Sequence, residues 1–182
     1  MGTKTRATIE DLYKIEGKAE LVNGAIVCLS PTGGLPGKAS LRIARRLLDY
    51  EESTGGGYAF PNNVAFAVKL PHRESFSPDA SWYVGPPPDM RFPQGAPVFA
   101  VEVRSENNNY KRDAERAMSA KRADYFACGT LVVWDVDLQS EDVVKSYKAS
   151  DPENPVLFRR GELADAEPAA PGWRMAVDEL FG

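Results

Sequence analysis

The chain has 182 residues, 43% hydrophobic and 26% charged, and this composition predicts one globular domain over residues 1–182. Its net charge of −4 and pI near 5.2 argue against a dedicated nucleic-acid-binding protein, although a bound cation offsets acidic charge locally. No apolar run approaches the roughly 18 residues of a membrane span, and the N-terminus carries no apolar signal segment, so we expect a cytoplasmic protein.

Histidine and cysteine are too scarce for several familiar kinds of catalytic site. His72 is the only histidine, which argues against a Ser–His–Asp triad and against a multi-histidine zinc site. Cys28 and Cys128 are typical of reduced packing residues rather than of a disulfide. Catalysis in this chain would therefore depend on carboxylates, lysine and a metal ion that prefers oxygen ligands.

The N-terminal residues predict a short helix, a hairpin and a longer helix. Thr8 is a suitable N-cap for the first helix, with acidic residues in the turn that follows. Asn23 and Gly24 tolerate the positive φ angles of a type I′ turn, which predicts a tight hairpin. The predicted elements are a helix (8–15), a hairpin (19–30), a loop (31–37) and an amphipathic helix (38–53).

The remaining residues predict strands of a sheet with one further helix between them. The apolar run VFAVEVRS is nearly continuous, as expected for a strand covered on both faces. The predicted elements are strands (58–60 and 64–70), a polar loop with His72 (71–75), a strand (76–84), an irregular segment (85–97), a strand (98–105), a helix (111–128), two paired strands (130–137 and 143–149), weaker strands (155–166) and a final strand and helical turn (172–182). This pattern predicts an α/β fold with a mixed central sheet and helices on both faces.

Two carboxylates lie in apolar runs that predict neighbouring strands. Asp79 is in FSPDASW and Glu102 is in VFAVEVRS. A buried carboxylate is costly unless it is paired, hydrogen-bonded or bound to a metal, and two side by side repel each other. Lys121 lies on the helix that follows, and Arg104 lies two residues after Glu102. These residues predict a divalent metal site with a cation beside it.

Structural interpretations of the same residues remain open at this point. An Asp at a strand start often caps a turn, and a Glu in a strand is often an exposed edge residue or a salt-bridge partner. Tyr125 could position Lys121 from the next turn of the helix, or it could pack beneath the sheet as an ordinary aromatic core residue.

The order of four segments resembles the Uma-type family of restriction-endonuclease-like proteins, which is assigned to the PD-(D/E)XK nuclease superfamily. The segments are ELVNGAIVCLSP, SPDAS, VEVRS and AKRADYFACGTLVVWDVD. The resemblance covers most of the chain, from about Thr8 to the terminal DELFG. It implies a restriction-endonuclease-like core and Mg²⁺- or Mn²⁺-dependent hydrolysis of phosphodiester bonds, with DNA as substrate. A homodimer would allow both strands of a duplex to be cut.

The resemblance also implies roles for individual residues. Asp79 and Glu102 would bind the metal, with the main-chain carbonyl of Val103 as a third ligand and Glu20 completing the site. The superfamily lysine would stand two residues after Glu102, where this chain has Arg104. We therefore expect Lys121 to fill the lysine role and Arg104 to contact phosphate. The alternative is a catalytically degenerate nuclease fold that binds nucleic acid or a protein partner without cleavage.

Overall fold

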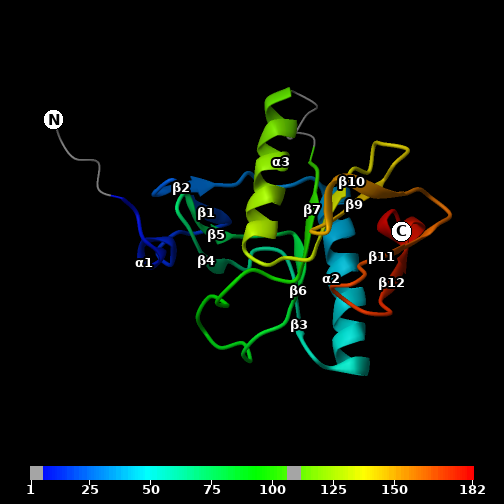
Figure 1. Ribbon diagram of the computed structural model, residues 1–182, viewed down its shortest axis with the longest axis horizontal. Coiled ribbons are helices and arrows are strands. Elements are labelled where there is room, and N and C mark those ends of the chain that lie inside the picture. The colour runs from blue at the N-terminus through cyan, green and yellow to red at the C-terminus, as the bar shows by residue number, and fades with distance from the viewer. Residues whose placement is uncertain (1–5, 106–111) are drawn as a thin grey trace.

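The structure, a computed structural model, describes residues 6–105 and 112–182. Its strands are β1 (Ala19–Val22), β2 (Ala25–Cys28), β3 (Tyr58–Phe60), β4 (Phe66–Leu70), β5 (Arg73–Phe76), β6 (Ala80–Tyr83), β7 (Phe99–Val103), β8 (Val132–Val136), β9 (Val144–Lys148), β10 (Asp151–Phe158), β11 (Leu163–Asp165) and β12 (Arg174–Ala176). Its helices are α1 (Ile9–Leu12), α2 (Gly34–Thr54), α3 (Arg112–Ala127) and the 3-10 helix η2 (Val177–Leu180). Figure 1 shows their arrangement.

Three sheets organise the described residues. The largest has six strands in the order β10-β9-β8-β7-β6-β3, the second has four in the order β2-β1-β5-β4, and β11 pairs with β12. In the six-stranded sheet β7 and β8 are parallel, while the other neighbours are antiparallel. A parallel pair needs a crossover connection, and α3 lies within it. The predicted α/β fold with a mixed central sheet is confirmed.

Helices cover both faces of the six-stranded sheet, and each encloses its own core. The larger core joins α2 to one face through buried residues that include Ile43, Leu47, Trp82, Val101 and Trp134. The smaller core joins α3 and the four-stranded sheet to the other face through Val68, Phe76, Ala100, Tyr125 and Val133. In Figure 1 the four-stranded sheet lies to the left of α3, and the C-terminal strands lie to its right. The candidate site residues described below lie on the α3 side.

The hairpin of β1 and β2 forms as predicted. Asn23 and Gly24 have φ angles of 53° and 70°, the two positive values that a type I′ turn requires. The turn sets the strand register, which places Glu20 opposite Val27. Side chains alternate along a strand, so a slip of one residue would turn Glu20 to the other face.

Both predicted N-terminal helices form, but their ends differ from the prediction. Thr8 caps α1 in a capping box with Asp11, although α1 ends at Leu12 rather than near Ile15. Helix α2 begins at Gly34, within the predicted loop. Pro36 is compatible with this start because the first turn of a helix has no intrahelical partners for its N–H groups.

The polar loop predicted at residues 71–75 is wrong. Arg73–Phe76 form β5, which pairs with β4 and β1. The single strand predicted over residues 76–84 does not form. Phe76 is the last residue of β5, and β6 begins only at Ala80. The sequence RESF does not show the alternation of apolar and polar residues that predicts a strand, because the buried positions Arg73 and Ser75 carry polar side chains. Their polar groups have partners elsewhere in the fold, which local sequence does not reveal.

The C-terminal elements agree with the predicted order. Helix α3 ends before Gly129, which has a φ angle of 94°, and β9 pairs antiparallel with β8. The predicted start of this helix, Lys111, lies outside the described residues. No helix in the described part of the chain is long and apolar enough to cross a membrane.

Candidate active site

Strand β7 presents alternate residues to opposite faces of the six-stranded sheet, and this alternation positions Glu102. Phe99, Val101 and Val103 belong to the core beneath α2, whereas Ala100 belongs to the core beneath α3. Because Glu102 is two residues after Ala100, its side chain lies on the α3 side. An acid on this face meets the side chains that α3 directs at the sheet.

Two groups of α3 reach the same oxygen of Glu102. The Tyr125 hydroxyl donates a hydrogen bond to Oε1 at 2.7 Å, and the Lys121 ammonium lies 2.8 Å from that atom. Burial raises the pKa of Glu102; Lys121 opposes this rise, and the charges of Asp79 and Glu20 add to it. The carboxylates are therefore close enough to repel one another.

Asp79 is anchored to the strand that carries Glu102. Its own N–H donates to the Val101 carbonyl at 2.8 Å, and the Val103 N–H donates to its Oδ2 at 2.7 Å. These two bonds reach β7 on either side of Glu102, so the two acids are neighbours. The other carboxylate oxygen, Oδ1, lies 2.6 Å from the ammonium of Lys18.

Glu20 brings a third carboxylate from the four-stranded sheet. Its Oε1 lies 2.8 Å from Lys121 Nζ and accepts a hydrogen bond from the Ser77 N–H at 2.9 Å. Its Oε2 accepts from Arg73 Nη1 at 2.7 Å. Burial alone would raise the pKa of Glu20, but the charges of Lys121 and Arg73 outweigh it and lower the pKa to about 2. Glu20 is therefore ionised at neutral pH.

Lys121 joins the two sheets by contacting Glu102 and Glu20 with one ammonium group. Burial alone would lower its pKa, but these two carboxylates reverse the effect and raise the pKa of Lys121 above its ordinary value. Lys121 is therefore a protonated hydrogen-bond donor at neutral pH, not a general base. It lies one helical turn before Tyr125, whose ring stacks on Phe76 with centroids 4.0 Å apart. Tyr125 therefore packs as an aromatic core residue, one of the two predicted alternatives, and its hydroxyl binds Glu102, while a direct role in positioning Lys121 stays a prediction.

Arg104 lies beside these carboxylates and is engaged by other acids. Its Nε and Nη2 each donate to Asp135 at 2.7 Å, and its Nη1 pairs with Glu115. Asp135 is fully buried on β8, directly opposite Glu102 in the parallel register. A planar guanidinium on a carboxylate in this two-pronged geometry is strongly oriented. The guanidinium of Arg104 is therefore directed at Asp135.

Sequence reasoning missed two cations of the cluster, Lys18 and Arg73. Lys18 precedes Glu20 by two residues, and the two-residue period of an extended strand would have placed both on one side. Arg73 was assigned to a loop, where arginine needs no partner. In the structure its Nε also donates to Asp124 at 2.8 Å, and Asp124 in turn lies 2.7 Å from Nε2 of His72.

The oxygen-rich donor set suits a hard divalent cation. Among residues 6–105 and 112–182 no three His, Cys, Asp or Glu side chains are arranged as a metal-binding group. Mg²⁺ needs only one or two carboxylates, because it keeps several waters. Burial is the main cause of the raised pKa of Glu102 and the charges of Asp79 and Glu20 add to it, and a bound cation would offset both effects. Asp79 and Glu102 are therefore the two carboxylates whose repulsion a bound divalent cation would offset.

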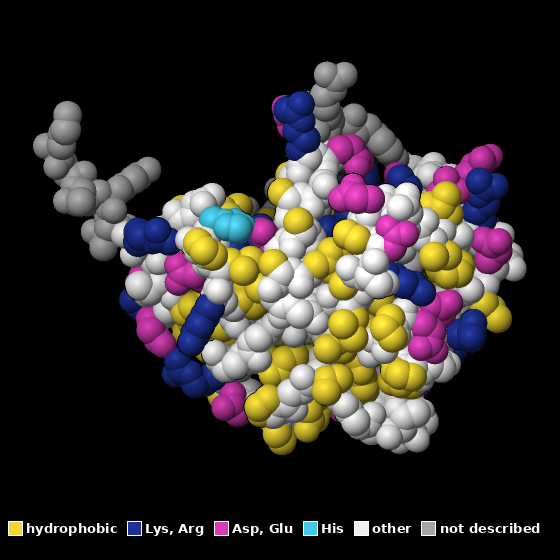
Figure 2. All heavy atoms as spheres, viewed as in Figure 1, with side chains coloured by type: hydrophobic (Ala, Val, Ile, Leu, Met, Phe, Trp, Pro, Cys, Tyr) yellow, Lys and Arg dark blue, Asp and Glu magenta, His cyan; other side chains and the backbone are white. Residues whose placement is uncertain are grey.

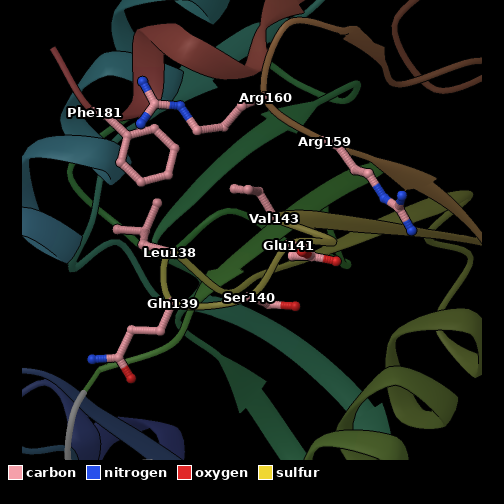
Figure 3. A pocket seen from close by; sticks show the side chains of 8 residues that line it. All are labelled: Leu138, Gln139, Ser140, Glu141, Val143, Arg159, Arg160 and Phe181. Carbon is pink, nitrogen blue, oxygen red and sulfur yellow. The ribbon is translucent and has the colours of Figure 1, made fainter.

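A separate pocket of about 490 Å³ lies after β8, near η2 (Figure 3). It is lined by Leu138, Gln139, Ser140, Glu141, Val143, Arg159, Arg160 and Phe181. Both arginines are already paired, Arg159 with Asp142 at 2.8 Å and Arg160 with Asp178 at 2.7 Å. None of the predicted site residues lines this pocket, so it is distinct from the carboxylate cluster.

Comparison with known proteins gives one family and one fold. A family model described as "Putative restriction endonuclease" matches residues 8–178. One solved structure with a similar fold is that of a protein from Anabaena variabilis described as a putative nuclease belonging to DUF820. It has 16% sequence identity and a TM-score of 0.74, and the match covers 96% of this chain and 97% of that one. No curated protein sequence matches this chain.

Proposed function

Because the chain belongs to the Uma2 family, we propose that it is a divalent-metal-dependent endonuclease that hydrolyses phosphodiester bonds in DNA. The family description supports a nuclease function, and the metal and the substrate are the finer part of the proposal. The observation that carries it is the meeting of Glu102 and Glu20 at the ammonium of Lys121, with Asp79 held beside Glu102 by the main chain of the same strand.

Asp79 and Glu102 are the proposed metal ligands, with the Val103 carbonyl as the third and Glu20 as an adjoining carboxylate. When bound, Mg²⁺ or Mn²⁺ would lower the pKa of a coordinated water and offset the negative charge of the phosphodiester. The Val103 N–H fixes the orientation of Asp79. Asp79 is therefore oriented before a metal binds, which favours catalysis by a preorganised site.

Lys121 is the proposed catalytic cation. Its raised pKa keeps it protonated, so it acts by donating hydrogen bonds to a water or to a phosphate oxygen and by balancing charge that develops there. The two carboxylates hold the ammonium in place, and the Tyr125 hydroxyl in turn holds Glu102. The phosphate contact of Arg104 stays a prediction, and it would require Arg104 to share a donor between phosphate and the exposed acid Glu115.

Cleavage of plasmid and single-stranded DNA with Mg²⁺ or Mn²⁺ tests the proposal. Wild-type protein should nick or linearise the plasmid only when the metal is present. Asp79→Ala and Lys121→Ala should each lower the rate by about 100-fold or more, since each removes a group acting on the reacting atoms.

Arg116→Ala is the matched control for the lysine variant, because Arg116 is an exposed cation on the same helix. Its cleavage rate should stay within about twofold of wild type, as expected of a screened surface charge. Equal activity of Asp79→Ala and wild type would contradict the assigned site and point to a contaminating nuclease.

A second candidate is a nuclease fold that binds nucleic acid or a protein without cutting. It is favoured by the pairing of Asp79 with Lys18, and of Glu102 and Glu20 with Lys121, which leaves each carboxylate with a cationic partner. Figure 2 shows charges of both signs interspersed around one face, without a broad basic area. Isothermal titration separates the candidates, because only the endonuclease requires Mn²⁺ binding that depends on Asp79 and Glu102.

A further inference from the structure

Lys18 makes the closest ionic contact with the proposed metal ligands. Its Nζ lies 2.6 Å from Asp79 Oδ1, and each of the two side chains is 17% exposed. The approach comes from the residue immediately before β1, on the same side of the chain as Glu20. A protein cation therefore contacts the carboxylate to which the metal is assigned.

Asp79 does not need Lys18 to hold its position. The main-chain N–H of Asp79 is bonded to Val101, and its Oδ2 accepts from the Val103 N–H. These two bonds come from the strand that carries Glu102, whereas Lys18 belongs to the segment that enters the other sheet. The contact with Lys18 thus adds charge to a carboxylate that the backbone already orients.

We propose that Lys18 is a built-in competitor of the metal: its ammonium occupies Asp79 in the metal-free protein, and the metal binds only by displacing it. The inference rests on the proposed function, because it concerns the same metal site. A divalent cation and an ammonium at one carboxylate oxygen repel each other strongly in a partly buried site. Lys18 therefore sets the metal concentration at which the site fills.

The proposal predicts whether metal affinity rises or falls when the charge of Lys18 is removed. If Lys18 competes with the metal, removing its charge raises metal affinity, because Asp79 is left with its oxygen free. If Lys18 only positions Asp79, the same change lowers metal affinity, because the ligand becomes less ordered. The two roles therefore have opposite consequences in one measurement.

The experiment is isothermal titration of Mn²⁺ into wild type, Lys18→Met, Lys18→Arg and Lys14→Met at one pH and salt concentration. Lys18→Met should bind Mn²⁺ about tenfold more tightly than wild type. Lys18→Arg keeps the charge, so its Mn²⁺ affinity should stay near that of wild type. Lys14→Met is the matched control, because Lys14 forms an exposed Lys–Asp pair with Asp11 at 2.9 Å. Its affinity should change by less than about twofold, which measures the effect of net charge alone.

Each outcome decides the inference. Mn²⁺ binding to Lys18→Met but not to wild type would support it most directly, since the lysine would then exclude the metal. Affinity that is unchanged or weaker in Lys18→Met would overturn it. The proposed metal site would still stand in that case, provided that Asp79→Ala abolishes the wild-type binding. Absence of Mn²⁺ binding in both proteins would overturn the inference and the proposed function together.

A second variant replaces Lys18→Met if that variant does not fold. Lys18→Gln removes the charge but keeps a donor for Asp79, and far-ultraviolet circular dichroism checks that each variant is folded. If Lys18→Met does not fold, the affinity of Lys18→Gln relative to wild type decides between tighter and weaker binding. Thermal denaturation with and without Mn²⁺ gives an independent reading, since tighter binding stabilises the variant more at equal metal concentration.

Discussion

Glu20 shows how a single buried residue depends on partners that are distant in sequence. Lys121, Arg73 and the Ser77 N–H all bind its two oxygens. A buried carboxylate with fewer partners would favour its neutral form. Glu20 instead has its pKa lowered to about 2 from an ordinary value of 4.5, so its ionised form stabilises the fold.

This lowered pKa predicts a pH-dependent stability. A carboxyl whose pKa is lower in the folded state contributes its full stabilisation above pH 4.5, and the contribution is lost as the pH falls toward 2. The difference in unfolding free energy between wild type and Glu20→Gln should therefore shrink by on the order of 1 kcal/mol between pH 7 and pH 3.5. Urea denaturation of both proteins at the two pH values measures it. A difference that stays constant or grows on acidification would contradict the ionised assignment.

At the scale of elements, the hairpin of β1 and β2 sets the register that directs Glu20 toward α3. The positive φ of Gly24, 70°, is a conformation that residues with a Cβ rarely adopt. This turn is local, and for that reason the sequence predicted it correctly. The start of α2 and the existence of β5 were predicted wrongly, because Pro36 and the buried polar residues of RESF have local properties that are also typical of loops.

Gly24→Ala should destabilise the protein by about 1–2 kcal/mol, the cost of placing a Cβ in the left-handed region. An added Cβ would also meet the flexible side chain of Arg6, with Nε at 2.8 Å. Gly34→Ala is the control, because its Cβ would meet nothing within 4 Å and it lies at the start of α2. Its stability should be unchanged or slightly higher. Chemical denaturation of both variants makes the comparison, and equal stabilities would contradict the role assigned to the turn.

At the scale of the whole molecule, the candidate site lies where the two larger sheets and α3 meet. Glu20 comes from the four-stranded sheet, Glu102 from the six-stranded sheet, and Lys121 from the helix between β7 and β8. A metal bound here would act on the folded state only, since the unfolded chain does not bring these ligands together. Metal binding should therefore stabilise the entire fold.

Mn²⁺ at about 100 times its dissociation constant should stabilise the wild-type protein by about 2.7 kcal/mol. For a chain of this size that corresponds to a rise of roughly 5–10 °C in Tm. Asp79→Ala should lose the metal-dependent rise, while Asp49→Ala, which removes an exposed acid from α2, should keep it. Differential scanning calorimetry with and without Mn²⁺ provides the measurement. A rise of the same size in Asp79→Ala would place the metal elsewhere.

The sequence by itself determined the features that local chemistry controls: the α/β class, the type I′ turn and most strands, including the strand of Glu102, whereas Asp79 stands immediately before β6 and not on it. Only the tertiary structure decided which cation meets which acid. Lys121 contacts Glu102 and Glu20, Lys18 contacts Asp79, and Arg104 is directed at Asp135. These pairings depend on the packing of α3 and of the two sheets, because a charged side chain takes the partner that the fold brings to it, and no short segment contains both members of such a pair.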